Sequence, residues 1–168
     1  MIDLTRETKE PLLMSSMPSP VGELRLFARG DALTGVYAGM QTPPEARVQS
    51  ARILERAAEQ LAAYFAGELT AFDLLLAPEG TEFQKKVWML LCAIPFGETR
   101  SYGQLATKLR RPTASRAVGA ANGRNPLGII VPCHRVIGAN GDLTGYAGGL
   151  AMKKWLLAHE QRQQSLIH

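Results

Sequence analysis

The chain has 168 residues, of which 46% are hydrophobic and 20% are charged, and its formal net charge is +4. This length suits one or two small domains, and the composition is that of a soluble, globular chain able to bury a core. No apolar run approaches the roughly 18 residues that a membrane-spanning helix needs, so we expect no membrane partner. The first residues mix acidic and basic side chains without an apolar segment, which argues against export and predicts a cytoplasmic protein.

The first half predicts a small sheet followed by a helix. Short strands are expected within residues 12–38, separated by the turn sequences SPVG and RGD. A helix is predicted after Pro43 and Pro44, because apolar residues recur at helical spacing from 54 to 65. AFDLLLAPEG predicts one more strand and a linker. No polar cluster typical of a site is found here, so we interpret residues 1–80 as a scaffold domain.

The second half begins with two predicted helices. TEFQKKVWMLLCAI contains a possible capping box of Thr81 and Gln84, and SYGQLATKL contains one of Ser101 and Gln104. Cys92 lies in the first helix, and we interpret it as a small buried hydrophobic residue rather than a reactive thiol.

A third helix, ASRAVGAAN, follows the turn RRPT, and this succession is typical of a helix-turn-helix unit. Apart from Arg116 it consists mostly of Ala, Gly and Ser, and it lacks the side chains that read base edges in a major groove. Small residues allow the helix backbone to approach DNA closely, as in a minor groove, or to pack tightly against another helix. The basic surroundings favour nucleic acid.

Those surroundings are set by an uneven division of charge. Residues 1–80 hold 7 Lys/Arg and 11 Asp/Glu, whereas residues 81–168 hold 12 Lys/Arg and 4 Asp/Glu. So basic a half is expected of a surface that contacts phosphates, and a solvated basic face is the simpler alternative. Charge alone leaves the two interpretations about even.

The segment GIIVPCHRVIGANG, residues 128–141, contains the most reactive side chains. IIVPCHRVI predicts a strand interrupted at Pro132, and the Asn-Gly pair that follows predicts a hairpin turn. A nucleophilic Cys133 needs a base or a positive field, and His134 is its neighbour. Because adjacent strand residues point to opposite faces, either the chain leaves strand geometry after Pro132 or a water carries the proton.

An imidazole base also needs an orienting partner, ideally a carboxylate. Residues 81–168 contain four candidates, and a last helix, LAMKKWLLAHE, could deliver Glu160 to the cysteine. Spacing does not choose among Glu82, Glu98, Asp142 and Glu160. Two other interpretations of Cys133 were weighed. A metal ligand is disfavoured, because the two cysteines and three histidines have no zinc-finger spacing. A cysteine and a histidine that only pack at a strand end deserve about half the weight if the motif stands alone.

The motif does not stand alone, since several segments resemble the 6-O-alkylguanine–DNA alkyltransferase family, most closely its bacterial constitutive type. They are FQKKVW, IPFGETRSYGQLA, SRAVGAANGRNP, IIVPCHRVIG and TGYAGGLAMKKWLLAHE. Pro-Cys-His-Arg-Val at 132–136 is that family's active-site signature. The resemblance is strong over residues 81–160 and weaker in SPVGELRL and LAAYFAGEL. It implies an α+β protein, with a ribonuclease-H-like sheet-plus-helix domain at 1–80 and a winged helix-turn-helix domain at 81–168.

The resemblance implies four catalytic residues. Cys133 would accept the alkyl group, and His134 would act through a water as its base. Glu160 would orient His134, and Asn125 would hold the loop that shapes the pocket.

It also implies which residues meet DNA and substrate. Arg116 would replace the extruded guanine in the base stack, and Tyr102 would guide extrusion and donate a hydrogen bond to the leaving base. The small residues expected against DNA are Ser115, Ala117 and Gly119. The residues expected to line the substrate pocket are Tyr146, Ala147, Gly148, Val136 and Trp88. Tyr146 and Gly148 would belong to a loop that closes over the alkyl group, and backbone atoms of Cys133 and Val136 would hold the guanine edge.

The implied function is direct reversal of DNA damage. The alkyl group of 6-O-alkylguanine, and of 4-O-alkylthymine, would pass irreversibly to Cys133 after base flipping, with one turnover per chain. No cofactor and no metal would be needed, and the zinc ligands of some members have no counterpart because residues 1–80 contain no Cys or His. The partner would be double-stranded DNA containing alkylated guanine. We expect a monomer in solution and leave cooperative binding on DNA open.

Two departures from the family pattern concern the pocket. Ala147 replaces a serine found in some members, and Gly128 stands where others have a proline. We therefore expect a roomier pocket that tolerates bulkier alkyl groups. The competing functions are a non-catalytic binder of alkylation damage, a transcription regulator and a thiol hydrolase. The presence of Cys133, the lack of a second regulatory module and the DNA-binding segments respectively argue against them.

Overall fold

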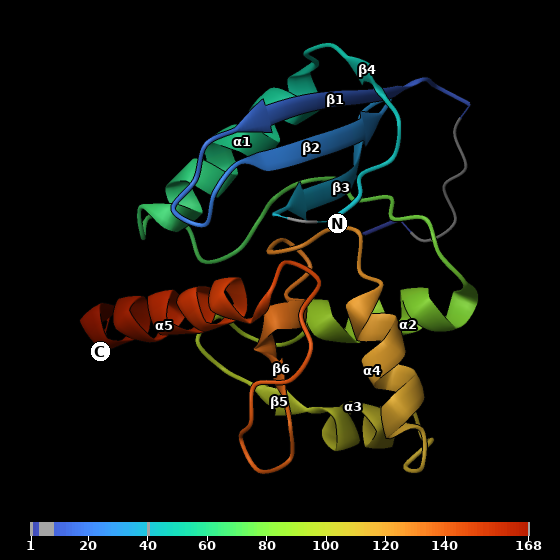
Figure 1. Ribbon diagram of the computed structural model, residues 1–168, viewed down its shortest axis with the longest axis vertical. Coiled ribbons are helices and arrows are strands. Elements are labelled where there is room, and N and C mark those ends of the chain that lie inside the picture. Colours follow the sequence, from blue (N-terminus) through green and yellow to red (C-terminus); the bar gives the residue numbers. More distant parts are fainter. Residues whose placement is uncertain (1, 4–8, 40, 168) are drawn as a thin grey trace. The chain divides into compact units, whose positions relative to one another are not determined.

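The computed structural model describes the chain except for residues 1, 4–8, 40 and 168 (Figure 1). The chain forms two compact units, Met1–Glu79 and Gly80–His168, and the expected boundary lay one residue further on. None of the helices in the described part is long and apolar enough to cross a membrane.

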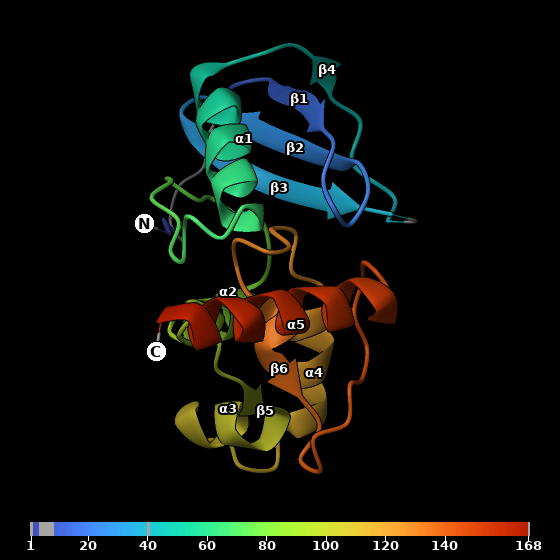
Figure 2. The same ribbon diagram turned by 90° about the vertical axis from the view of Figure 1, so that its left-hand side faces the viewer.

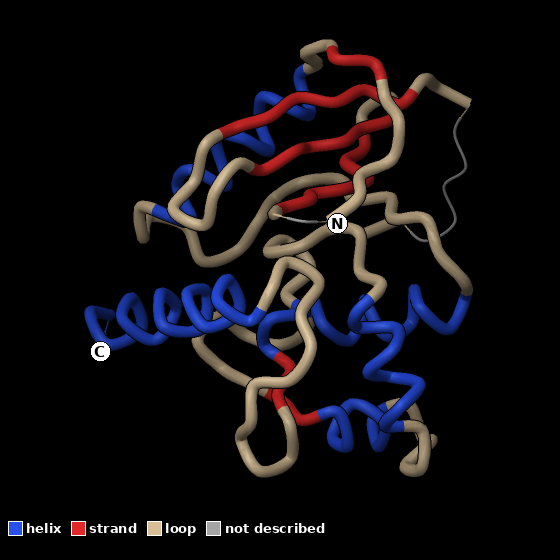
Figure 3. Tube along the Cα trace, viewed as in Figure 1, coloured by secondary structure: helices blue, strands red, loops and turns tan. Residues whose placement is uncertain are grey.

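The N-terminal unit contains a sheet of four strands in the order β3-β2-β1-β4, drawn red in Figure 3. Its strands are β1 (Leu12–Met17), β2 (Leu24–Arg29), β3 (Ala32–Ala38) and the short β4 (Arg47–Val48). The first three, which were predicted as strands, are antiparallel neighbours, and β4, which was not predicted, pairs in parallel with β1. Gly30, with φ +57, makes the tight turn from β2 to β3 that a residue with a side chain rarely adopts.

The helix α1 (Arg52–Phe65) lies across one face of this sheet (Figure 2). It ends in a Schellman motif, in which the N–H of Gly67 donates to Tyr64 O and that of Glu68 donates to Ala63 O. Its buried face, which includes Leu61, packs on the strands in an apolar core. The alternation of apolar and polar residues in the strands and the helical period of α1 therefore build one core.

The extra strand predicted in AFDLLLAPEG is wrong. Leu76 makes only isolated bridges, to Ile2 and Leu33. Other backbone groups of this segment bond to a side chain and not to a strand. Asp73 N–H donates to Gln60 Oε1 at 2.8 Å, and Asp73 O accepts from Gln60 Nε2 at 2.9 Å. A strand needs those groups for a neighbouring strand.

The C-terminal unit is mainly helical. Its elements are α2 (Glu82–Cys92), β5 (Arg100–Ser101), α3 (Tyr102–Lys108), α4 (Ser115–Gly123), the 3₁₀ turn η1 (Cys133–Arg135), β6 (Val136–Ile137) and α5 (Leu150–Ile167). Both predicted capping boxes are confirmed, with Thr81 at the start of α2 and Ser101 at the start of α3. The helices α2 and α3 both pack on α4.

Two predictions for this unit are wrong. Cys92 is exposed, because it lies about 100° around α2 from Leu91, the last buried residue of the helix. The Asn140-Gly141 turn forms, with Gly141 at φ +86, but it closes no hairpin. The strand before it, β6, pairs in parallel with β5 instead.

Candidate active site

The thiol of Cys133 is carried by a tight turn and not by a strand. The chain reaches it through turns, since Val131 N–H donates to Leu127 O at 2.9 Å and Cys133 N–H donates to Val131 O at 2.8 Å. Strand geometry begins only at Val136. The predicted strand is therefore wrong before that residue. Cys133 and His134 lie in a 3₁₀ turn, so the rule that strand neighbours point to opposite faces does not apply to them.

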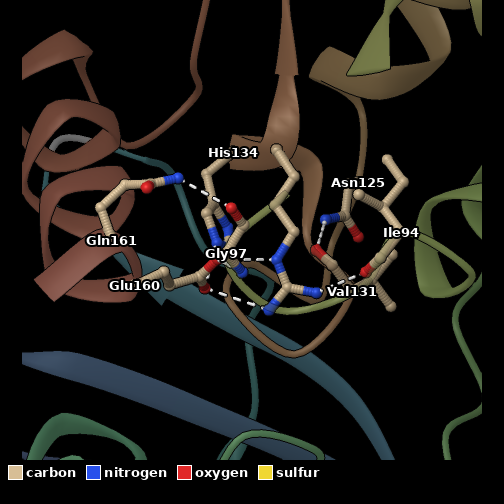
Figure 4. Close-up of polar contacts among 8 residues, drawn as sticks. Ile94, Gly97, Asn125, Val131, His134, Glu160 and Gln161 are labelled. Carbon is tan, nitrogen blue, oxygen red and sulfur yellow. Dashed lines mark hydrogen bonds and ion pairs between the residues drawn. The ribbon is translucent and has the colours of Figure 1, made fainter. Parts of the chain in front are cut away.

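Backbone strain accompanies this turn. Ile129 has φ +72, in the left-handed region that β-branched residues rarely enter, and its side chain is buried. Such a conformation costs of the order of 1–3 kcal/mol and persists only where the surroundings enforce it. Asn125 supplies part of that enforcement. Its Oδ1 accepts from Leu127 N–H at 2.9 Å, and its Nδ2 donates to Val131 O at 2.8 Å. The buried amide thus spans the loop that leads to Cys133 (Figure 4).

Of the four candidate carboxylates, Glu160 is the one that meets the imidazole. Its Oε2 lies 2.7 Å from His134 Nε2, and both side chains are fully buried. Arg135 completes the group, because Nε donates to Glu160 Oε1 at 2.8 Å and Nη2 donates to Oε2 at 3.0 Å. A third donor, Nη1, reaches Ile94 O at 2.7 Å (Figure 4). The predicted contact between His134 and Glu160 is confirmed, whereas the sequence reasoning assigned no role to Arg135.

The protonation states follow from these contacts. Burial alone would raise the pKa of Glu160, but the hydrogen bonds from His134 and Arg135 and the positive charge of Arg135 outweigh it and hold that pKa far below its usual range. Burial lowers the pKa of His134, against the opposing effect of Glu160. The site therefore pairs an ionised carboxylate with a neutral imidazole.

The tautomer of that imidazole follows as well. Nε2 faces a carboxylate, which only accepts, so Nε2 carries the proton and Nδ1 keeps a lone pair. Nδ1 is buried and has no hydrogen-bond partner among the described residues. Burial raises the pKa of the Cys133 thiol, while Asn125, Lys153 and backbone N–H groups act in the opposite direction. A protonated thiol thus directly precedes, in the chain, a buried imidazole that can act as a base.

The predicted DNA-contacting residues lie on α3 and α4. Tyr102 is the first residue of α3, and its hydroxyl bonds Thr144, donating to the carbonyl at 3.3 Å and accepting from Oγ1 at 3.2 Å. Gly119 lies against the Tyr102 ring, since a Cβ there would be 3.7 Å from it. Arg116 and Ala117 are exposed on α4 and Ser115 is half-buried.

The predicted pocket residues differ in placement. Tyr146 is half-buried and Ala147 exposed, in the loop before α5. Gly148 has no room for a side chain, because a Cβ would lie 2.6 Å from Met152 Sδ and 3.1 Å from the Tyr146 ring. Burial raises the pKa of Tyr146, and the charges of Cys133 and Glu160 add to this effect. The loop therefore carries the Tyr146 ring into the electrostatic surroundings of the thiol.

The remaining two pocket residues are buried. Val136 is buried in β6, and its carbonyl accepts from Lys153 Nζ at 2.6 Å. Trp88 is a core residue of α2, and its indole N–H donates to Ala121 O on α4 at 2.9 Å. Its described contacts hold α2 against α4. This packing role could have been predicted from the sequence, because Trp88 is a large apolar residue in the apolar stripe of α2.

No group of three or more His, Cys, Asp or Glu residues in the described part of the chain could hold a metal ion.

Two family models match the chain. The ribonuclease-like domain of 6-O-methylguanine DNA methyltransferase matches residues 12–78, and the DNA binding domain of the same family matches residues 82–162. A relative from Mycolicibacterium paratuberculosis, named methylated-DNA–protein-cysteine methyltransferase, is 53% identical over 150 residues, 88% of this chain and 91% of that protein. A relative of the same name from Methanosarcina acetivorans is 62% identical over 117 residues, 70% of this chain and 75% of that protein.

Solved structures agree with these matches. The crystal structure of Mycobacterium tuberculosis OGT in complex with DNA has a TM-score of 0.86 and 49% identity, covering 90% of this chain and 94% of that one. The O6-methylguanine-DNA methyltransferase of Pyrococcus kodakaraensis has a TM-score of 0.67 and 26% identity, covering 89% and 98%. The sequence motifs, the two-unit fold and these matches agree that the chain belongs to the 6-O-methylguanine DNA methyltransferase family.

Proposed function

We propose that this protein is a DNA-repair methyltransferase that moves the alkyl group of 6-O-alkylguanine in double-stranded DNA to the thiol of Cys133. The observation that carries the proposal is the buried contact of 2.7 Å between His134 and Glu160, next to a buried cysteine. The name shared by the relatives from M. paratuberculosis and M. acetivorans supports the reaction, and the DNA complex of the M. tuberculosis relative supports the partner.

The first step is removal of the thiol proton. A neutral imidazole whose Nδ1 has a free lone pair can accept that proton, and a water can carry it from Cys133 Sγ. The ionised Glu160 then stabilises the imidazolium that forms, because opposite charges attract strongly in a buried site. Burial alone raises the pKa of the Cys133 thiol. His134 and Glu160 together therefore lower the free energy needed to form the thiolate.

The second step is displacement at the alkyl carbon. The thiolate forms an S–C bond while the bond between that carbon and the guanine oxygen breaks, and the electron pair passes to the base. The leaving base takes up one proton, for which we propose the hydroxyl of Tyr102 as donor. The thioether product is too stable to return the alkyl group, so each chain reacts once.

A base within a duplex cannot offer its alkyl carbon to a buried thiol. We propose that the guanine is flipped out of the stack, with the exposed Arg116 side chain filling the gap and the small residues of α4 against the backbone. The 12 Lys/Arg of residues 81–168 supply the attraction to phosphates. Repair of 4-O-alkylthymine and a cytoplasmic location stay predictions.

The test is the intact mass of the protein after incubation with a methylated-guanine oligonucleotide. We expect the gain of one methyl group, mapped to Cys133, and none in Cys133→Ser. Cys92→Ser is the matched control, because Cys92 is the other cysteine and is exposed, so this variant should gain the methyl group normally. Unmodified protein that binds the oligonucleotide tightly would indicate a binder, and repeated turnover without DNA would indicate a hydrolase.

Substrate breadth needs a separate measurement. Ala147 is exposed and lacks the hydroxyl that a serine would place there, so we propose that larger alkyl groups are accepted. Repair rates on methylated and benzylated oligonucleotides should then be of similar size. A protein that repairs only the methylated oligonucleotide contradicts this part of the proposal and leaves the main reaction intact.

A further inference from the structure

Lys153 is a fully buried cation that the proposed reaction does not yet use. It lies in the first turn of α5, and 0% of its surface is exposed. Lysine is almost never fully buried unless its charge is stabilised, because desolvating an ammonium group costs several kcal/mol. The adjacent Lys154 is exposed, so the helix had an outward alternative for a basic side chain.

The ammonium group of Lys153 is held by two carbonyl oxygens from different segments. Nζ donates to Val136 O at 2.6 Å and to Thr144 O at 2.8 Å. Val136 follows the turn that carries the thiol, and its own N–H donates to Cys133 O. Thr144 lies in the loop between β6 and α5, two residues before Tyr146. One side chain thus fixes the strand beside the thiol and the loop predicted to close over the alkyl group.

The same loop is attached to the DNA-contacting helix. The Tyr102 hydroxyl donates to the Thr144 carbonyl, the acceptor that Lys153 also uses, and accepts from Thr144 Oγ1. Figure 1 shows the loop running from β6 past β5, the strand that precedes α3, before it turns back to α5. Hydrogen bonds therefore connect Tyr102, Thr144, Lys153 and Val136 in an unbroken series.

We infer that Lys153 is a positioning residue for alkyl transfer, which holds the Val136 carbonyl and the substrate loop in place and links both to Tyr102. This inference rests on the proposed function and deepens it. Because Thr144 O is shared by Lys153 and Tyr102, a shift of Tyr102 on DNA is transmitted to the loop that carries Tyr146. The arrangement of the pocket then depends on how α3 is positioned on DNA.

The positive charge has a second effect, on the thiolate. Lys153 lowers the pKa of Cys133 against the larger effect of burial, and Cys133 in turn opposes the burial that lowers the pKa of Lys153. The other titratable or charged groups of this cluster are His134 and Arg135 on η1, Glu160 on α5 and Tyr146 in the loop. Removal of Lys153 should therefore make the thiolate harder to form.

The first test compares Lys153→Met with Lys154→Met, its exposed neighbour. We expect Lys153→Met to slow the reaction of Cys133 with free 6-O-benzylguanine on the order of 100-fold, since a small misplacement of reacting groups can cost that much. The pH at which the rate reaches half its maximum should move upward. Lys154→Met should react like the wild type, and Lys153→Arg should restore most of the rate because it keeps the charge and the donors.

Several results decide the matter. A lysine that only supports the fold would lower the fraction of active protein without moving the pH profile of the molecules that react. Wild-type rate and profile in a Lys153→Met protein that melts normally would overturn the inference. Failure of the proposed function is distinct, because the wild type itself would then gain no methyl group.

The second test leaves the buried charge untouched. Thr144→Val removes the hydroxyl bond to Tyr102 and keeps the Thr144 carbonyl that Lys153 holds. We expect transfer from a methylated duplex to slow about fivefold, the value of one hydrogen bond, with the free-base reaction unchanged. An unchanged duplex rate would overturn the part of the link to Tyr102 that the Thr144 hydroxyl carries, and equal losses on both substrates would mean that Thr144 acts on the pocket alone. This variant decides the link even if Lys153→Met does not fold.

Discussion

The two units of the chain differ in what they bury. The buried residues described in Met1–Glu79 are apolar, and the ion pairs described there, such as Arg56–Asp73, each have an exposed carboxylate partner. Every buried polar or charged residue in the described part of the chain lies in Gly80–His168: Asn122, Asn125, His134, Arg135, Lys153, His159 and Glu160. The described core of the N-terminal unit is thus apolar, and such burial contributes roughly 25 cal/mol per Å².

This difference shows that the C-terminal unit, which contains the candidate active site, is the one that buries charged groups at a cost in stability. Buried ion pairs often stabilise a fold less than apolar residues of the same size, yet removing one partner of such a pair strongly lowers the stability. The C-terminal unit therefore has a stability that depends on a few contacts and on pH, whereas the N-terminal unit should respond mainly to lost volume. Trp88 and Trp155 are the chain's two tryptophans, so tryptophan fluorescence reports on unfolding of the C-terminal unit.

The largest expected effect is on Arg135. Arg135→Met removes the bidentate partner of Glu160 and leaves a buried carboxylate with His134. We expect the free energy of unfolding to fall by about 3–5 kcal/mol, measured by urea titration with tryptophan fluorescence. Asp73→Asn breaks the exposed pair in the other unit and should change stability by less than about 0.5 kcal/mol. Similar losses in both variants would remove the contrast between the units.

A somewhat smaller loss is expected from a cavity in the N-terminal unit. Leu61 is fully buried, and Leu61→Ala should cost about 2–5 kcal/mol in that unit, measured by calorimetry. The remaining folded protein should react with free 6-O-benzylguanine at the wild-type rate, because no buried polar contact is changed. A slower reaction of folded protein would show that the apolar unit also shapes the chemistry.

Acid should weaken the C-terminal unit selectively. The pKa values of His134 and Glu160 are lower in the folded protein than in an unfolded chain, so unfolding takes up protons. Their stabilisation is complete above the unfolded values, about 6.5 and 4.3, and is lost as the pH falls below them. Below about pH 4.3 the slope due to Glu160 should approach 1.4 kcal/mol per pH unit. Urea titrations between pH 7 and pH 3.5 check this, and Glu160→Gln should flatten the acid part of the curve.

The smallest effect concerns the start of the C-terminal unit. Thr81 caps α2 and accepts from Gln84 N–H at 3.1 Å. Thr81→Ala should cost about 1 kcal/mol, while Thr81→Ser should keep most of the stability. Equal stability of the Ala and Ser variants in urea would mean that the cap contributes nothing here.

Local signals explain what could be predicted from the sequence. Both capping boxes and the strands within residues 12–38 follow from short-range rules, and they are found. Four carboxylates could have met His134 on spacing alone, and the resemblance selected Glu160, the one in contact. The roles of the site residues in catalysis stay predictions.

The misses have a physical pattern. Periodicity places polar side chains outward, so it gives no hint that Lys153 and Arg135 are buried. Their partners are tertiary, namely carbonyls of Val136 and Thr144 in one case and Glu160 in the other. The conformation before Cys133 was missed for a different reason. β-branched residues favour strands, and the sequence pattern gave no sign that the Asn125 amide would tie the loop around Ile129 into a turn.

The parallel pair of β5 and β6 has a consequence for how such a site can evolve. Ser101 lies opposite Ile137 and is followed by Tyr102, whereas Val136 lies opposite Arg100 and follows the turn of Cys133. This ladder of two residues fixes the position of α3 relative to the turn that carries Cys133. A register slip of one residue would turn the side chains of one strand to the opposite face relative to its partner. Under the proposed function, a change in substrate size is therefore expected to come from the loop between Ile137 and Leu150, which can change in length without altering this pairing.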